Sequence, residues 1–140
     1  MPRRRSRHTE DHRSDARERA LALLYEAESK GVPPRDVLAA QVIDVDEITT
    51  LIVEGVQDGQ GDIDELLVSY SKGWSLARMP SIDRAVLRMA VFELRDRPDV
   101  PTAVVLDEAV ELVKRFSTED SGRFVNGMLA AIAPAVRSPG

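Results

Sequence analysis

The chain has 140 residues, of which 43% are hydrophobic and 31% charged, a balance that is typical of one globular domain and excludes wholesale disorder. It contains no cysteine, which excludes disulfides and thiolate metal sites and fits the reducing cytoplasm, where we expect the protein. No apolar run approaches the ~20 residues of a membrane-spanning helix, and the net charge of −5 would by itself argue against a nucleic-acid ligand.

The charges are unevenly distributed along the chain. Residues 1–19 carry seven arginines against four acids, whereas residues 20–140 carry 12 bases against 20 acids. A basic arm on an acidic body indicates an anion-binding N-terminus. Because residues 1–12 show no apolar period, we predict a flexible Arg-rich tail there and a single helical domain over residues 13–137.

Apolar residues recur at helical spacing through the first half of the domain. Ser14 is expected to cap a first helix that ends at Gly31, and a short second helix is expected from Arg35 to Gln41. A third helix is expected to start at Asp44 or Asp46 and to loosen at three glycines, Gly55, Gly59 and Gly61. A further helical set follows, made of Ile63, Leu66, Leu67 and Tyr70.

Three more amphipathic helices are predicted in the second half. Their expected caps are Ser81, Thr102 and Ser121, each followed by an apolar stripe at helical spacing. No segment shows a convincing alternation with a period of two residues. The sequence therefore predicts an all-α fold of about six or seven amphipathic helices in one domain.

Residues typical of catalysis or metal binding are sparse. His8 and His12 lie in the predicted tail, and no glutamate directly follows His8 as a zincin motif requires. The acids Asp107, Glu108 and Glu111 share a helix face, where carboxylates are usually solvated or paired. We therefore expect no enzymatic activity, no metal and no cofactor.

Three sets of residues are candidates for ligand contacts. Arg13 and Arg17 are four residues apart, hence on one side of the first helix, and guanidinium groups suit phosphate; the alternative is a solvated basic tail. Arg84 and Arg88 repeat this spacing on an otherwise apolar helix. The start of the last helix combines an arginine, an aromatic ring and an amide: Arg123, Phe124 and Asn126.

A helix start with this composition suits single-stranded RNA. Helix N-termini favour anions, Phe124 can stack on a base, and Asn126 can bond a base edge. The alternative is that Phe124 packs inward and Asn126 satisfies a backbone group. Trp74 is interpreted as a structural anchor of the connector before Ser81, although a stacking role is also open.

At these stretches the sequence resembles the NusB family. The resemblance rests on Asp83–Arg88 with Phe92–Leu94, then Val100-Pro101, Asp107–Leu112 and Phe124–Leu129, supported by Ala16–Ala20 and Leu24-Tyr25 near the N-terminus. The order and spacing agree over roughly residues 13–137. Each motif is weak alone, and their ordered combination is specific.

The resemblance implies about seven helices in two packed bundles. It also implies binding of the single-stranded boxA element in ribosomal RNA leader transcripts, together with NusE, a ribosomal protein of the small subunit. This pair would help RNA polymerase pass terminators in ribosomal RNA genes. No cofactor or catalytic residue is implied.

The resemblance also assigns residues to the two surfaces. The implied RNA-binding residues are Arg13, Arg17, Tyr70, Asp120, Arg123, Phe124 and Asn126. The implied partner-binding residues, on the helix associated with NusE docking, are Arg84, Arg88 and Glu93. Where many relatives carry further bases, this chain has Ser14 and Asp15, so we expect weak RNA binding alone and tighter binding with NusE.

An alternative function remains open. Extensive apolar faces on the helices are also compatible with a helical protein-interaction module, or with a homodimer, that binds no specific RNA. A molecular mass that rises with protein concentration would support a dimer.

Overall fold

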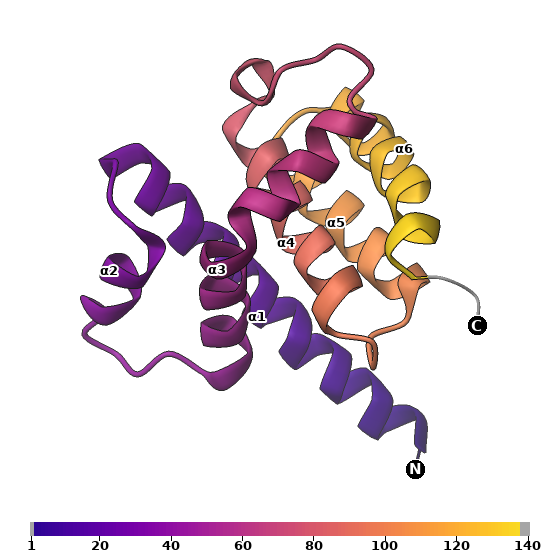
Figure 1. The fold of residues 1–140 in the computed structure, drawn as a ribbon. Coiled ribbons are helices and arrows are strands. Elements are labelled where there is room, and N and C mark those ends of the chain that lie inside the picture. The colour runs from indigo at the N-terminus through magenta and orange to yellow at the C-terminus, as the bar shows by residue number, and fades with distance from the viewer. Residues whose placement is uncertain (1, 138–140) are drawn as a thin grey trace.

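The computed structural model describes the backbone of residues 2–137 and the side chains of residues 12–137. Figure 1 shows the helices, which are α1 (Pro2–Lys30), α2 (Pro34–Ala39), α3 (Glu47–Tyr70), the 3-10 helix η1 (Leu76–Arg78), α4 (Ser81–Asp96), α5 (Thr102–Phe116) and α6 (Glu119–Val136). No strand occurs within these described residues, so the predicted all-helical class is confirmed.

Helix α4 lies at the centre of the fold. It contacts α3, α5, α6 and α1, whereas α2 packs against α1 and α3. Ten of its 16 residues are buried, because it has neighbours on several sides. The interior is aliphatic, and its largest fully buried side chains include Ile52, Ile63, Leu67, Leu87, Leu94, Leu129 and Ile132. Burial of such side chains is the main force that holds the helices together.

Helix α1 starts earlier than predicted. It begins at Pro2, so Ser14 lies inside the helix, and its hydroxyl donates a hydrogen bond to the Glu108 carboxylate on α5. The predicted cap at Ser14 is therefore wrong. The Arg-rich tail stays a prediction, because the side chains of residues 1–11, including His8, lie outside the described part.

Helix α3 is continuous where a break was predicted. A Cβ atom added to Gly55 would lie 2.0 Å from Cε1 of Phe92 on α4, which is far inside van der Waals contact. Gly55 therefore permits a close approach of α3 to α4 and does not end the helix. Residues 47–70 form one helix instead of two.

Helix starts are capped differently from the prediction at three positions. Proline precedes both Ser81 and Thr102 in extended backbone conformation, which makes Pro80 and Pro101 the N-caps. The cap of α6 is Thr118, which accepts from the backbone N–H of Ser121 in a reciprocal capping box. At α4 and α5 the fixed φ of the preceding proline moves the cap by one residue from the predicted hydroxyl. At α6 the capping box moves it by three residues, from Ser121 to Thr118.

Of the two predicted starts of the third helix, Asp44 and Asp46, the structure selects Asp46, which is the N-cap of α3. Its carboxylate accepts hydrogen bonds from the backbone N–H of Thr49 at 3.0 Å and from the Thr49 hydroxyl at 2.6 Å. Partial burial by itself would raise the pKa of the Asp46 carboxyl group. The hydrogen bonds from Thr49 have the opposite effect and together outweigh burial, so the pKa lies below its usual value.

Asp46→Ala is expected to lower the free energy of unfolding by about 1 kcal/mol at neutral pH. Because the pKa of Asp46 is lowered in the folded state, its charge makes its full contribution to the free energy of unfolding at pH values above the ordinary aspartate pKa. It is lost as the pH falls through the folded-state pKa. Urea unfolding over this acidic range is the measurement, with the exposed neighbour Asp44→Ala as control. If the difference in free energy of unfolding between Asp46→Ala and wild type did not shrink in acid, Asp46 would not act as a charged cap.

Candidate functional site

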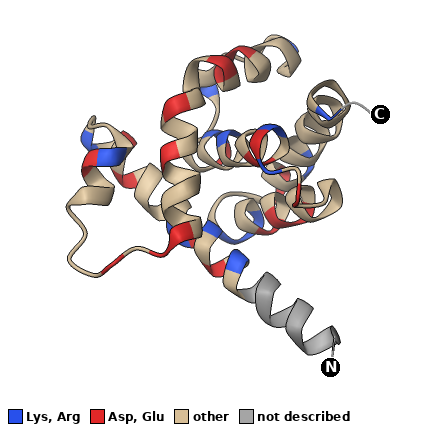
Figure 2. Cartoon of the chain, turned by 60° about the horizontal axis from the view of Figure 1, so that its bottom comes forward, with Lys and Arg blue, Asp and Glu red and all other residues tan. Residues whose placement is uncertain are grey.

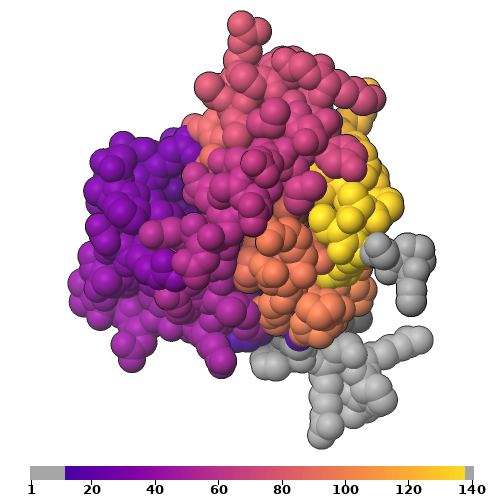
Figure 3. Space-filling model, viewed as in Figure 1, coloured from indigo at the N-terminus to yellow at the C-terminus, as the bar shows by residue number. Residues whose placement is uncertain are grey.

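Several of the predicted RNA-binding residues gather at one end of the molecule, where α3 ends and α6 begins. A pocket of about 420 Å³ is lined by Tyr70, Arg123 and Phe124 together with Lys72 and Trp74. A second pocket of about 360 Å³ is lined by Trp74, Phe124 and Asp120, among others. The connector between α3 and α4 forms the top of the view in Figure 3, beside the start of α6. We call this surface the aromatic end.

Trp74 and Phe124 form the centre of the aromatic end. Their ring centroids are 6.5 Å apart and their planes are tilted by 52°, an arrangement typical of aromatic pairs. The side of Phe124 that faces inward packs against the core, so the alternative of core packing holds in part. Trp74 is 55% exposed, which is more than a structural anchor requires.

A tight turn presents Trp74 at the surface. Lys72 and Gly73 adopt positive φ angles of 52° and 93°, and the Ser71 hydroxyl donates to the carbonyl of Trp74 at 2.6 Å. The Lys72 conformation is unusual for a residue with a side chain. Sequence reasoning missed Lys72, and a Lys-Gly pair before the only tryptophan was the available signal.

Unpaired cations also gather at the aromatic end. Most described arginines are tied to carboxylates or carbonyls, as Arg137 is to the carbonyls of Leu94 and Val100. Lys72, Arg78 and Arg123 are exposed, and no ion pair joins them to another described residue. Their charge is thus available to an anion.

Asp120 and Asn126 are exposed on the first turns of α6. No hydrogen bond joins the Asn126 amide to another residue of the described part, so the structure does not give it the backbone-capping role that was the alternative. Asp120 lines the pocket of about 360 Å³ and offers its carboxylate to a ligand there. Asn126 lines neither pocket, so the structure does not bring it together with Phe124, and its contact with RNA stays a prediction.

Arg13 lies far from the aromatic end. Its guanidinium is 3.6 Å from the Asp99 carboxylate in the loop after α4, whereas the aromatic end lies beside the start of α4. Because α4 has 16 residues and a helix rises 1.5 Å per residue, its two ends are about 24 Å apart. A ligand that contacts both must be extended.

Arg17 and Glu93 form a buried ion pair with each other. Nε and Nη2 of Arg17 donate to the two carboxylate oxygens of Glu93 at 2.8 and 3.0 Å, and Nη1 lies 3.3 Å from Glu108. Arg17 is only 3% and Glu93 only 4% exposed. The structure thus corrects both assignments: in this arrangement neither residue is accessible to RNA or to a partner, and both hold α1 against α4.

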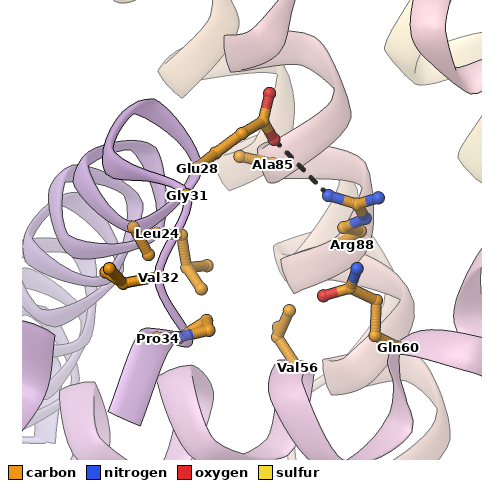
Figure 4. A pocket seen from close by; sticks show the side chains of 10 residues that line it. Leu24, Glu28, Gly31, Val32, Pro34, Val56, Gln60, Ala85 and Arg88 are labelled. Carbon is orange, nitrogen blue, oxygen red and sulfur yellow. Dashed lines mark ion pairs between the residues drawn. The ribbon is translucent and has the colours of Figure 1, made fainter. Parts of the chain in front are cut away.

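Arg84 and Arg88 join α4 to its neighbours. Arg84 donates to the carbonyls of Leu76 and Met79 and to Glu28, and Arg88 binds Asp64 through two hydrogen bonds of 2.8 and 3.0 Å. Figure 4 shows Arg88 and Glu28 across the rim of a pocket of about 300 Å³ between α1, α3 and α4. Both arginines are partly exposed and remain candidates for a partner contact.

The rest of the surface carries mixed charge. Basic and acidic positions are interspersed over the helices in Figure 2. No group of histidines and acids that could hold a metal ion occurs among the residues with described placement, and none of the described helices is long and apolar enough to cross a membrane.

The fold and the aromatic end define a class: a small all-helical protein that has an exposed tryptophan, a partly buried phenylalanine and unpaired cations at one end. The family model of the NusB family matches residues 14–134. Transcription antitermination proteins NusB from Saccharopolyspora erythraea and Kineococcus radiotolerans are 52% and 46% identical over 127 and 125 residues. These matches cover 86% of this chain and 86% and 92% of the two relatives.

The chain belongs to the NusB family. Its fold is similar to that of T. maritima NusB, with a TM-score of 0.79 and 34% identity over 86% of this chain and 89% of the other. It is also similar to a chain in the structure of antitermination factors NusB and NusE in complex with dsRNA, with a TM-score of 0.76 and 27% identity over 89% and 98%. The resemblance noted from the sequence is thus confirmed, and it agrees with the expectation of a protein that is not an enzyme.

Proposed function

We propose that this protein is an RNA-binding transcription antitermination factor. It binds the single-stranded boxA element of ribosomal RNA leader transcripts together with NusE, and it supports processive transcription of ribosomal RNA genes by RNA polymerase. The observation that carries the proposal is the aromatic end, where unpaired cations surround two accessible rings. Membership of a family whose relatives are named as antitermination proteins supports it.

The chemistry of the aromatic end suits single-stranded RNA. Lys72 and Arg123 attract the phosphate backbone, and Phe124 offers a face for an unstacked base. The Asp120 carboxylate supplies a hydrogen-bond acceptor for a base edge in the smaller pocket. Asn126, which is exposed on α6 outside both pockets, is a proposed contact for RNA that extends beyond the aromatic end. Paired bases in a duplex would keep their faces stacked on one another, so the rings favour a single strand.

NusE is the proposed protein partner, and the related structure of NusB with NusE and dsRNA supports this choice. Arg84 and Arg88, at the junction of α1, α3 and α4, are the proposed contacts. The acidic body and the presence of Ser14 and Asp15 in place of bases limit electrostatic attraction to RNA. We therefore expect NusE to raise the affinity for RNA, and equal affinity with and without NusE would contradict this expectation.

Arg123→Gln and Lys72→Gln are each expected to weaken binding of a labelled boxA RNA. Each should also reduce the slope of log affinity against log salt by ~0.7, because each removes one phosphate contact on a single strand. Fluorescence anisotropy at a series of salt concentrations measures both effects. Arg35→Gln is the matched control. Arg35 on α2 is already bound to Glu54 and Asp58, so its replacement should leave the salt slope unchanged. Equal slopes for all three variants and wild type would exclude the aromatic end as the RNA surface.

A further inference from the structure

The wall between the two pockets of the aromatic end consists of Trp74 and Phe124. These are the two residues that line both pockets. The Trp74 ring comes from the connector after α3 and the Phe124 ring comes from α6. The wall therefore forms only when these two segments pack together. Trp74 is exposed, whereas Phe124 is partly buried.

The two pockets differ in charge. The pocket of about 420 Å³ is lined by the unpaired cations Lys72 and Arg123. The pocket of about 360 Å³ has no cation in its lining and contains the carboxylates of Asp83 and Asp120. Asp83 is buried; its Oδ2 accepts from the Ser121 hydroxyl at 2.8 Å, and its Oδ1 has no hydrogen-bond partner in the described structure. A phosphate is therefore attracted to the first pocket and repelled from the second.

We propose that Trp74 is a second base-stacking residue and that the Trp74–Phe124 pair separates two consecutive bases of the RNA. One nucleotide lies in the cationic pocket with its phosphate against Lys72 and Arg123. The next base lies in the acidic pocket against the rings and presents N–H groups to the Asp120 carboxylate, while its phosphate stays outside. This inference rests on the proposed RNA-binding function and goes beyond it by assigning Trp74 and the order of the two pockets.

Stacking on Trp74 can be observed directly, because it is the only tryptophan of the chain. Titration of the 140-residue protein with boxA RNA is expected to quench its tryptophan fluorescence. The affinity, measured separately by anisotropy of labelled RNA, is expected to fall about tenfold in Trp74→Leu. Trp74→Phe keeps a ring and should retain most of the affinity. Tyr25→Leu removes another exposed aromatic, on α1, and should have no effect on binding of RNA alone.

RNAs with single abasic positions test the two-base arrangement. Removal of either of two adjacent bases should weaken binding to wild type, and the same removals should have a much smaller effect on Trp74→Leu. RNA that binds wild type and Trp74→Leu equally, without quenching, would overturn the role of Trp74 and leave the proposed function standing. Absence of any RNA binding to wild type would overturn both.

Discussion

Arg17→Met is expected to lower the free energy of unfolding by about 3–5 kcal/mol, because it leaves the buried Glu93 carboxylate without its counter-ion. The two side chains meet through a pair of parallel hydrogen bonds, at 2.8 and 3.0 Å. Both are almost fully buried, so water cannot replace the lost partner. Glu108, 3.3 Å from the same guanidinium, would add a second uncompensated charge.

Urea unfolding of the variants measures this effect. Arg35→Met is the matched control, since Arg35 also bonds two carboxylates but its side chain is 41% exposed; the loss there should be much smaller because water and salt screen the charges. The double variant Arg17→Met with Glu93→Met should be more stable than the sum of the single losses predicts. Equal losses in Arg17→Met and Arg35→Met would contradict a buried ion pair.

Gly55→Ala is expected to destabilise the protein by about 1–3 kcal/mol, although alanine is the better helix former. The added Cβ would lie 2.0 Å from Cε1 of Phe92 and 2.5 Å from two further ring atoms. Phe92 is 4% exposed, so its ring cannot move aside without displacing the core. Gly55→Val should be worse, since it adds more atoms at the same contact.

Gly61→Ala is the control for Gly55→Ala. It lies on the same helix, and a Cβ there would meet no atom within 4 Å, so this variant should be stabilised by up to ~1 kcal/mol. Phe92→Leu, which removes ring atoms, should lessen the effect of Gly55→Ala when the two are combined. If the losses in free energy of unfolding for Gly55→Ala and Phe92→Leu were strictly additive in the double variant, the added Cβ at position 55 would not clash with the Phe92 ring.

Helical periodicity predicted most of the fold, and packing across the chain explains what it missed. The apolar stripes of α4, α5 and α6 are local and regular, so these helices could be predicted within a few residues. Gly55 was interpreted as a weak point because helix propensity is a property of one segment. Its actual role depends on Phe92, which lies on a different helix and is visible only once α3 and α4 are packed.

The candidate site was also predictable only in part, because spacing along one helix is visible in the sequence and contacts between helices are not. Residues on one helix start, such as Arg123 and Phe124, share a surface by virtue of local spacing. The spacing of Arg13 and Arg17 placed them on one side of α1, but it did not reveal that α4 covers Arg17 with a carboxylate. Trp74 was interpreted as an anchor because its exposure depends on the left-handed conformation of Lys72, which residue type does not indicate.

Binding of a labelled boxA RNA, compared with a scrambled RNA of the same composition, tests the central claim most directly. The measurement is made with and without NusE at two salt concentrations. We predict that the protein prefers boxA, that NusE increases the affinity, and that Phe124→Ala removes most of the preference. Equal binding of both RNAs, even with NusE present, would contradict the account and favour a protein-interaction role for the same fold.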